Sequence, residues 1–207
     1  MRVKQEKFKN ILLKEAKLKS KPKPKPSKKD FLKSEYADEL FRTYKKLGGI
    51  MDEFPSRFRG WDVELKNVVI ELDDERHFNR YRIITLGSEI YKKLDFFPME
   101  KYLKLCKEYE SICLRAATWS EKWTSYPSVD QYGEAGPEGE LEGNGAPRWK
   151  QRAFYDLIRD TTQLMTDYKV IRIPIWDKIE DAIVDDIITG KRKDLIPNLI
   201  EYVKSLI

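Results

Sequence analysis

The sequence predicts an α/β fold in which helices flank a mixed central sheet, with a helical and loop insertion in the middle of the chain. Apolar, β-branched runs within residues 61–73 and 168–175 have the length and bounds of strands. Elsewhere, apolar residues recur at helical spacing before, between and after these runs. The 207 residues match one domain of ordinary size, with room for an appendage.

Composition excludes several classes of protein. With 41% apolar and 12% aromatic residues, the chain has enough bulk for a core, which argues against disorder and against a collagen-like fibre. Cys106 and Cys113 are too few for a disulfide framework, and their spacing favours reduced thiols on one helix face. No signal peptide opens the chain and no apolar run approaches the roughly 18 residues of a membrane helix. We therefore expect a soluble, cytoplasmic protein without a membrane partner.

Charge divides the chain into a basic arm and an acidic remainder. Residues 1–33 carry 13 Lys and Arg against three acids, a net charge of +10, whereas the remainder has a net charge of −5. Residues 2–19 fit an amphipathic basic helix, and the Lys-Pro run 21–26 predicts an extended linker, so residues 1–29 form the arm. The arm is a solubilising tail, a membrane-surface helix, or an anchor that binds nucleic-acid phosphates through Lys21, Lys23 and Lys25. We adopt the anchor.

The folded domain, residues 30–207, begins with a helix over 30–47 that is capped by Asp30 and ended by Gly48-Gly49. A loop follows, then an alternating strand over 61–65, a turn at Lys66-Asn67 and an apolar strand over 68–73. The second strand has the pattern of a strand at the centre of a sheet. Helical spacing predicts helices over 74–94 and 98–117.

Residues 118–147 are rich in Gly and Pro, which indicates a long functional or mobile loop within an insertion at about 84–147. Its residues Trp119, Trp123 and Tyr126 either stack on nucleic-acid bases or pin the loop to the core. A helix over 148–166, a strand over 168–175 and helices over 176–189 and 194–207 complete the chain. The two C-terminal helices provide core packing or the face of a homodimer.

Three carboxylates gather on the first two predicted strands. Asp62 lies on the first, and Glu71 and Asp73 lie on one side of the second because side chains alternate along a strand. Buried carboxylates are costly unless they are paired or bind a cation, and an all-oxygen set suits Mg²⁺ or Mn²⁺. The alternative is that the acidic strand end caps the next helix. His77, the single histidine, follows Asp73 by four residues and is a candidate proton acceptor or donor.

These residues resemble the nuclease core of the PD-(D/E)XK superfamily, most closely its very-short-patch-repair endonuclease branch. That branch has an Asp on one strand, a strand that ends Glu-Leu-Asp-Gly with a His shortly after, and a later strand similar to residues 170–173 (VIRI). Gln151 and Tyr155 are similar to the Gln-x-x-x-Tyr helix of the branch that includes phage exonucleases and helicase-nuclease subunits. The resemblance covers about residues 60–83 and 148–177.

The resemblance implies a restriction-endonuclease-like core that cleaves DNA with a metal ion. Asp62, Glu71 and Asp73 would hold Mg²⁺ or Mn²⁺, and His77 would act as the base or orient the attacking water. Gln151 and Tyr155 would both face the site, because helix positions four apart share a face. Phosphate contacts would come from the basic residues that open the same helix, which are Arg148, Lys150 and Arg152.

The chain also departs from the superfamily pattern. Asp74 replaces the usual Gly, Asp73 stands where a catalytic Lys is typical, and about 65 residues are inserted where simpler relatives have one helix. The very-short-patch branch also lacks the Lys. The acid of the first core helix is either Glu35 or Glu39, and the sequence does not distinguish them.

We therefore expect a Mg²⁺-dependent DNA endonuclease of repair, restriction or defence. A catalytically inactive nucleic-acid-binding or interaction module on the same fold is the first alternative. The second is an unrelated α/β protein in which the acidic strand end is structural.

Overall fold

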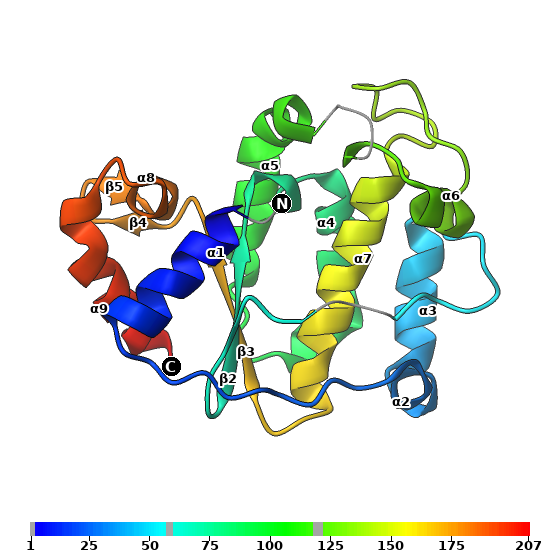
Figure 1. Cartoon of the computed structure of the whole chain (residues 1–207). Coiled ribbons are helices and arrows are strands. Elements are labelled where there is room, and N and C mark those ends of the chain that lie inside the picture. The colour runs from blue at the N-terminus through cyan, green and yellow to red at the C-terminus, as the bar shows by residue number, and fades with distance from the viewer. Residues whose placement is uncertain (1–2, 57–59, 118–121) are drawn as a thin grey trace. The chain divides into compact units, whose positions relative to one another are not determined.

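The computed structural model describes residues 3–56, 60–117 and 122–207. They fold into two compact units, which can be followed along the chain in Figure 1. Unit 1 is formed by Met1–Pro24, Arg59–Asp74 and Thr166–Ile207. Unit 2 is formed by Lys25–Phe58 and Glu75–Met165.

Unit 1 contains a three-stranded sheet in the order β1–β2–β3. β1 (Val63–Glu64) pairs antiparallel with β2 (Val68–Asp73), and β3 (Lys169–Pro174) pairs parallel with β2 (Figure 1). The predicted α/β class and mixed sheet are therefore confirmed. β2 has the predicted bounds, whereas β1 is shorter than the run 61–65 because the Leu65 N–H already closes the turn onto the Val68 carbonyl.

One face of the sheet is apolar and forms the core of unit 1. Alternate residues along a strand point to the same face. The buried members of this face are Val63, Val68, Ile70, Leu72, Ile171 and Ile173. The same alternation leaves Glu71 and Asp73 together on the opposite face, as their spacing of two predicts.

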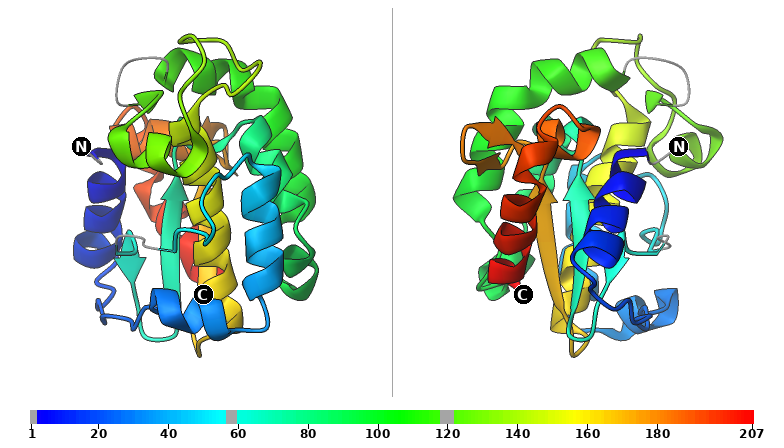
Figure 2. Two further views of the ribbon diagram at one scale, coloured as in Figure 1. Left: turned by 90° about the vertical axis from the view of Figure 1, so that its right-hand side faces the viewer. Right: turned by 60° about the vertical axis from the view of Figure 1, so that its left-hand side comes forward.

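Helices from both ends of the chain pack on the apolar face. They are α1 (Val3–Asn10) with the π-helical turn η1 (Ile11–Glu15), α8 (Val184–Thr189), the 3₁₀ turn η6 (Lys193–Leu195) and α9 (Ile196–Leu206). The right-hand view of Figure 2 shows α1 and α9 together in front of β2 and β3. The C-terminal helix predicted over 194–207 is thus confirmed, and its apolar side serves core packing.

The basic arm joins this core through its first helix. Phe8 and Leu12 are fully buried and Ile11 is 6% exposed, all within the apolar cluster of unit 1. The amphipathic helix predicted for residues 2–19 is confirmed over residues 3–15, whereas residues 16–19 are not helical, and its apolar side belongs to the fold. This differs from a freely appended tail, because removing the helix would expose the apolar face of the sheet.

The Lys-Pro run is extended, as predicted, and lies along β1. The Lys21 N–H donates to the Glu64 carbonyl (2.9 Å), and the Lys23 N–H donates to the Glu64 carboxylate (3.2 Å). The Tyr168 hydroxyl donates to the Pro24 carbonyl (2.9 Å). Because β1 is an edge strand of this sheet, the run satisfies backbone groups that an edge would otherwise expose.

The helix predicted over residues 176–189 is wrong in its first half. β4 (Lys178–Ile179) and β5 (Ala182–Ile183) form a small antiparallel hairpin, and α8 begins after it. Glu180 lies in the turn with a φ of +54°, a left-handed conformation that a helix does not contain. The apolar spacing in this stretch reflects hairpin residues that face the core.

Unit 2 is helical in the part that the structure describes. Its elements are α2 (Lys28–Lys33), α3 (Ala37–Lys46), η2 (Glu75–His77), α4 (Arg80–Leu86), η3 (Glu89–Lys93), α5 (Met99–Ala117), α6 (Tyr126–Tyr132), α7 (Pro147–Thr161) and η5 (Thr162–Leu164). α7 contacts α3, α4 and α6. The left-hand view of Figure 2 shows α3, α6 and α7 as neighbours, with α7 in the middle of the unit.

Two long predicted helices are each divided. The helix expected over 30–47 is split into α2 and α3, because Ser34 has an extended backbone and its hydroxyl bonds to the Phe31 carbonyl. The helix expected over 74–94 contains η2, α4 and η3, because the side chains of Asn79 and Ser88 cap new helical starts. The helix expected over 98–117 is confirmed as α5.

In the described part of the Gly-rich stretch, residues 122–147, the chain forms α6, a helix that the composition does not indicate. α6 begins with a capping box between Ser125 and Ser128. Trp123 is 1% exposed, and its ring centroid lies 5.4 Å from that of Trp149, so it pins the stretch to α7. Trp119 lies outside the described residues, and Tyr126 is 83% exposed.

Cys106 and Cys113 are buried on α5 and are not joined by a disulfide, as predicted. Along the described residues, none of the helices combines the length and the apolar content needed to cross a membrane.

The packing of α1 and η1 makes a stability prediction. Replacing the fully buried Leu12 with Ala should lower the free energy of unfolding by about 2–5 kcal/mol, because it opens a cavity in the core of unit 1. The matched control is Lys7→Ala on the exposed side of α1, which should change stability by less than about 0.5 kcal/mol. Urea unfolding measures both, and equal effects would show that the arm does not contribute to the core.

Candidate functional site

The face of the sheet opposite the apolar core carries ionisable side chains. Val63 pairs with Ile70 in the antiparallel ladder, so Asp62 comes opposite Glu71 one step further along. Arg172 on β3 is the partner of Glu71 in the parallel ladder. Asp73 lies on the same sheet face as Glu71, because side chains two residues apart on a strand point to the same side. Asp62, Glu71, Asp73 and Arg172 are 8%, 2%, 0% and 5% exposed. Unit 1 thus presents three buried acids and one buried arginine on one sheet face.

Donors within unit 1 hold each of these carboxylates. Arg172 Nη1 donates to Asp73 Oδ1 at 2.7 Å, which forms a buried ion pair. The Leu72 N–H donates to Asp62 Oδ2 at 3.0 Å, and the Asp62 N–H donates to Glu71 Oε1 at 3.2 Å. These contacts offset the cost of removing charge from water, and they connect the residue before β1 to the centre of β2.

Asp74, which follows β2, is held by the N-terminal helix. Gln5 on α1 donates to Asp74 Oδ2 at 3.3 Å and to the Leu72 carbonyl at 3.4 Å. Gln5 is 7% exposed and lies three residues before the buried Phe8, on the inner side of α1. The sequence patterns above do not predict this contact. The signal available for it is that Gln5 is a polar residue at an apolar position of an amphipathic helix.

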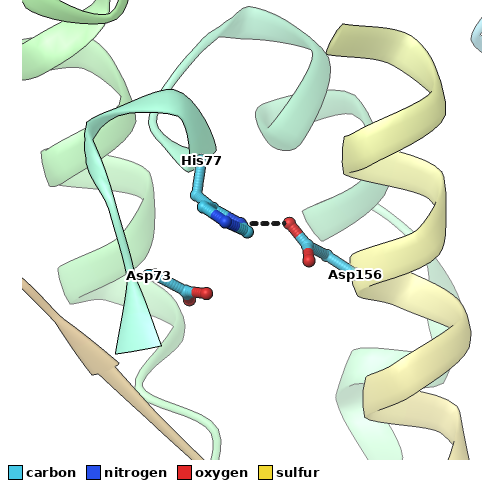
Figure 3. A group of neighbouring side chains, drawn as sticks. All are labelled: Asp73, His77 and Asp156. Carbon is cyan, nitrogen blue, oxygen red and sulfur yellow. Dashed lines mark hydrogen bonds and ion pairs between the residues drawn. The ribbon is translucent and has the colours of Figure 1, made fainter. Parts of the chain in front are cut away.

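His77 and Asp156 form a buried pair within unit 2. Figure 3 shows the contact, in which His77 Nδ1 lies 2.8 Å from Asp156 Oδ2; Asp73, also labelled there, ends β2 in unit 1. His77 Nε2 lies 3.2 Å from Arg152 Nη1. A guanidinium group only donates, so this contact is a hydrogen bond when Nε2 is unprotonated. Nδ1 then carries the proton and donates it to Asp156.

Gln151 and Tyr155 share a face of α7, as their spacing predicts, and both contact one residue of α6. Gln151 Nε2 donates to Gln131 Oε1 at 3.0 Å, and Gln131 Nε2 donates to the Tyr155 hydroxyl at 3.2 Å. Gln131 has no local pattern that singles it out in the sequence. Its contacts join residues 20 and 24 positions apart, which periodicity does not reveal.

The predicted phosphate-binding residues lie on two segments, the helix α7 and the Lys-Pro run of the arm. Arg148 and Arg152 are half-buried on α7, and Lys21 and Lys25 are exposed. Lys23 is half-buried, with its ammonium 5.6 Å from the Tyr168 ring centroid and bonded to the Lys66 carbonyl. Phosphate binding by the residues of the arm stays a prediction.

Lys150 differs from this expectation. It is 6% exposed, and its Nζ donates to Asn144 Oδ1 at 2.6 Å. The Asn144 amide donates in turn to the Tyr132 carbonyl (2.9 Å) and to the Glu134 carbonyl, which fastens the Gly-rich loop. Lys150 therefore supports this loop from inside unit 2, and its burial lowers the pKa of its ammonium group.

The two candidate acids of the first helix also have local roles in unit 2. Glu35 makes an exposed ion pair with Lys93 at 3.0 Å. Glu39 Oε1 accepts from the Ser88 hydroxyl (2.7 Å) and from the Glu89 N–H (3.0 Å), so it supports the start of η3. Burial opposes ionisation of Glu39, but these hydrogen bonds outweigh it and leave its pKa lowered. A functional role for either residue stays a prediction.

The burial of Lys150 predicts a specific dependence of stability on pH. The unfolded chain, with the ordinary lysine pKa of 10.5, binds this proton more tightly than the folded chain does. The free energy of unfolding should therefore rise relative to Lys150→Met as pH increases from the folded pKa toward 10.5. Below the folded pKa the difference between the two proteins should be constant.

Urea unfolding across this pH window measures the difference, and the exposed Lys104→Met on α5 is the matched control. A difference that does not change with pH would contradict the effect of burial on Lys150.

Comparison with known proteins gives one match. The model of a family of unknown function, DUF7255, matches residues 42–190. No curated protein and no solved structure matches the chain. The matched range contains β2, β3 and α7, and with them Asp62, Glu71, Asp73 and Arg172. Because the match covers more than half of the 207 residues, the chain belongs to the DUF7255 family of unknown function.

Proposed function

We propose that this protein is a metal-dependent nuclease that hydrolyses phosphodiester bonds in DNA, on a restriction-endonuclease-like core. The observation that carries the proposal is the polar sheet face of unit 1. Three buried acids there share one face with Arg172, and Asp62, just before β1, comes opposite Glu71 on β2. The resemblance of residues 60–83 and 148–177 to PD-(D/E)XK nucleases supports the same function.

The ligand set suits a hard divalent cation. Carboxylate oxygens of Asp62, Glu71 and Asp73 are the ligands that Mg²⁺ and Mn²⁺ prefer, with water and substrate phosphate completing the shell. A bound ion would polarise the scissile phosphate and lower the pKa of a water molecule. Arg172 holds Asp73 by its buried ion pair, which fixes the position of that carboxylate at the end of β2.

His77 is the proposed base. Asp156 accepts the Nδ1 proton, so Nε2 is the accepting nitrogen of the ring. Nε2 takes the Arg152 hydrogen bond here, and it would accept a proton from water only when Arg152 moves to a substrate phosphate. In this arrangement the Asp156 carboxylate fixes the orientation and the tautomer of the His77 ring. Gln151, Tyr155, Arg148 and Arg152 are the proposed contacts to the nucleic acid, and Lys21, Lys23 and Lys25 its non-specific anchor.

A catalytically inactive nucleic-acid-binding module is the second candidate, and one observation favours it. The buried ion pair with Arg172 already neutralises Asp73, at the position where the superfamily typically has a catalytic Lys. The Gln5 contact to Asp74 likewise gives the extra acid a structural partner. A fold that retains the acidic face for stability alone would show both features.

A cleavage assay separates the two candidates. Incubation of the full chain with duplex DNA, single-stranded DNA or RNA and Mg²⁺ or Mn²⁺ should give products, and EDTA should abolish them. Glu71→Gln should lower the rate by at least about 100-fold, because it removes a charged ligand from the metal. The matched control is Glu201→Gln, an exposed acid on α9 of the same unit, which should leave the rate unchanged.

Binding of these nucleic acids without cleavage would favour the second candidate. Cleavage that survives unchanged in Glu71→Gln would exclude the proposed metal site.

The role of Asp156 is tested through His77. Asp156→Asn removes the charge that supports the His77 ring and should reduce the cleavage rate about 10- to 100-fold. His77→Ala should reduce it about 10²- to 10⁴-fold, and adding Asp156→Asn to that variant should cause no further loss. Asp130→Asn, an exposed acid on α6, is the control. An equal effect of Asp156→Asn with and without His77 would show that the pair does not act as a unit.

A further inference from the structure

A hollow in the surface of unit 2 combines positive charge with apolar side chains. It is lined by five residues that share one face of α3, namely Asp38, Phe41, Arg42, Lys45 and Lys46. Phe41 is half-buried and the other four are exposed. Lys45 Nζ donates to the Met51 carbonyl (2.8 Å), which brings the segment after α3 beside the hollow. That segment adds two exposed apolar side chains, Ile50 (59%) and Met51 (37%). We call this surface the α3 hollow.

The charge of the α3 hollow is only partly neutralised within the protein. Arg42 pairs with Glu39 at 2.7 Å. Neither Lys45 nor Lys46 forms an ion pair among the described residues, and Asp38 lies at the other end of the helix face. Exposed apolar side chains beside such cations are typical of an interaction surface. An occupant that matches the hollow brings anionic groups together with an apolar group.

An acidic peptide fits the α3 hollow better than a nucleic acid does. A single-stranded nucleic acid binds such a surface by stacking its bases on open aromatic faces. Lys45 Nζ already lies over the Phe41 ring, 5.2 Å from its centroid. The other apolar side chains, Ile50 and Met51, are aliphatic and offer no stacking surface. The chemistry therefore favours a peptide in which carboxylates flank an apolar side chain.

The Gly-rich loop of unit 2 carries such a peptide at its tip. Glu140-Leu141-Glu142 lies between two glycines whose φ angles are +89° and +59°, which glycine adopts without strain. Glu140 is exposed and Leu141 is half-buried. The Glu142 side chain is 94% exposed, with its carboxylate 3.8 Å from Arg80 Nη1. A Cβ atom at Gly143 would meet no atom within 4 Å, so the tip borders on open space.

The loop presents this tip on a fixed neck. The Gly136 N–H donates to the Gly145 carbonyl (2.9 Å), and the Trp123 indole N–H donates to the Gly136 carbonyl (3.0 Å). A Cβ atom at Gly145 would collide with the Tyr81 hydroxyl, so the neck packs closely on α4. Figure 1 shows the loop extending beyond α6 and the start of α7. Because the neck already holds the loop, docking of its tip costs little conformational entropy.

The loop tip and the α3 hollow belong to neighbouring parts of the same unit. The loop follows α6 directly, and the Ile50 N–H donates to the carbonyl of Gln131 on α6 (3.0 Å). Each copy of the chain therefore carries both complementary surfaces. Two copies related by a two-fold axis can make the contact between tip and hollow twice, once in each direction.

We propose that two copies of this chain form a dimer in which the loop tip of each copy docks in the α3 hollow of the other. Leu141 packs against the apolar side chains of the hollow, and its two flanking glutamates face Lys45 and Lys46. The dimer does not depend on the proposed nuclease function.

Sedimentation velocity of the full chain measures this self-association. At low salt the mean mass of the wild type should rise with protein concentration from monomer toward dimer, and added salt should weaken the dimer because it screens exposed charges. Two variants reverse the charge of one surface each: the hollow variant is Lys45→Glu/Lys46→Glu, and the tip variant is Glu140→Lys/Glu142→Lys. Each should weaken association at least about tenfold, because like charges then meet in both contacts.

Two further variants separate net charge from the specific contact. Lys104→Glu/Lys107→Glu, at exposed positions of α5, changes the net charge as the hollow variant does and should associate as the wild type does. Leu141→Ser keeps the charge of the tip but removes its apolar group, and should weaken association about tenfold. Thermal unfolding checks that each variant is folded.

The two charge reversals should rescue each other. In an equimolar mixture of the hollow variant and the tip variant, every tip meets a hollow of opposite charge, so the mixture should form a heterodimer although each variant alone associates weakly. A wild type that stays monomeric at every concentration, or a mixture of folded variants that does not associate, would overturn the proposal. A dimer that both reversals leave intact would place the contact on another face and overturn it as well. Loss of DNA binding in the hollow variant without a change in self-association would assign the α3 hollow to nucleic acid instead.

Discussion

The burial of charge on β2 is the constraint on which the rest of unit 1 depends. The strand is buried at every position, with apolar residues on one face and Glu71 and Asp73 on the other. A buried carboxylate is stable only when hydrogen-bond donors contact it. Arg172 must therefore lie beside Asp73, and the start of β1 must lie beside Glu71. A slip of one residue in either ladder would put the acids into the apolar core. The ionic contacts thus select the register of all three strands.

The N-terminal helix has two roles in this arrangement. Its apolar side completes the core through Phe8, Ile11 and Leu12, and Gln5 on its inner side reaches the end of β2. The arm that carries most of the positive charge is therefore tied to the strand that carries the acids. Its lysines remain outside, where Lys21 and Lys25 are exposed. A single segment then contributes to stability through its apolar side and to the proposed binding of nucleic acid through its charged side.

Sequence patterns predict the strongly periodic helices and strands of this fold. They miss the helix breaks and helix starts that are set by a hydrogen bond from a single side chain. β2 and α5 have the expected bounds, because apolar runs and helical spacing act over the whole element. The breaks at Ser34 and Asn79, and the start of α6 at Ser125, depend on single capping side chains inside otherwise periodic stretches. At the site, alternation correctly places Glu71 and Asp73 on one face. The partners Gln5 and Gln131 were missed because their contacts join residues far apart along the chain. Gln5 is marked only as a polar residue on the apolar side of α1, and Gln131 by no local pattern.

The central claim is that the acidic face of the sheet binds a divalent cation, and thermal unfolding in the presence of Mn²⁺ or Mg²⁺ tests it most directly. A ligand that binds the folded state alone stabilises it by about 2.7 kcal/mol at 100 times its dissociation constant. The melting temperature of the wild type should therefore rise with metal concentration, and that of Glu71→Gln should rise far less. No rise in the wild type, or an equal rise in Glu71→Gln, would contradict the claim.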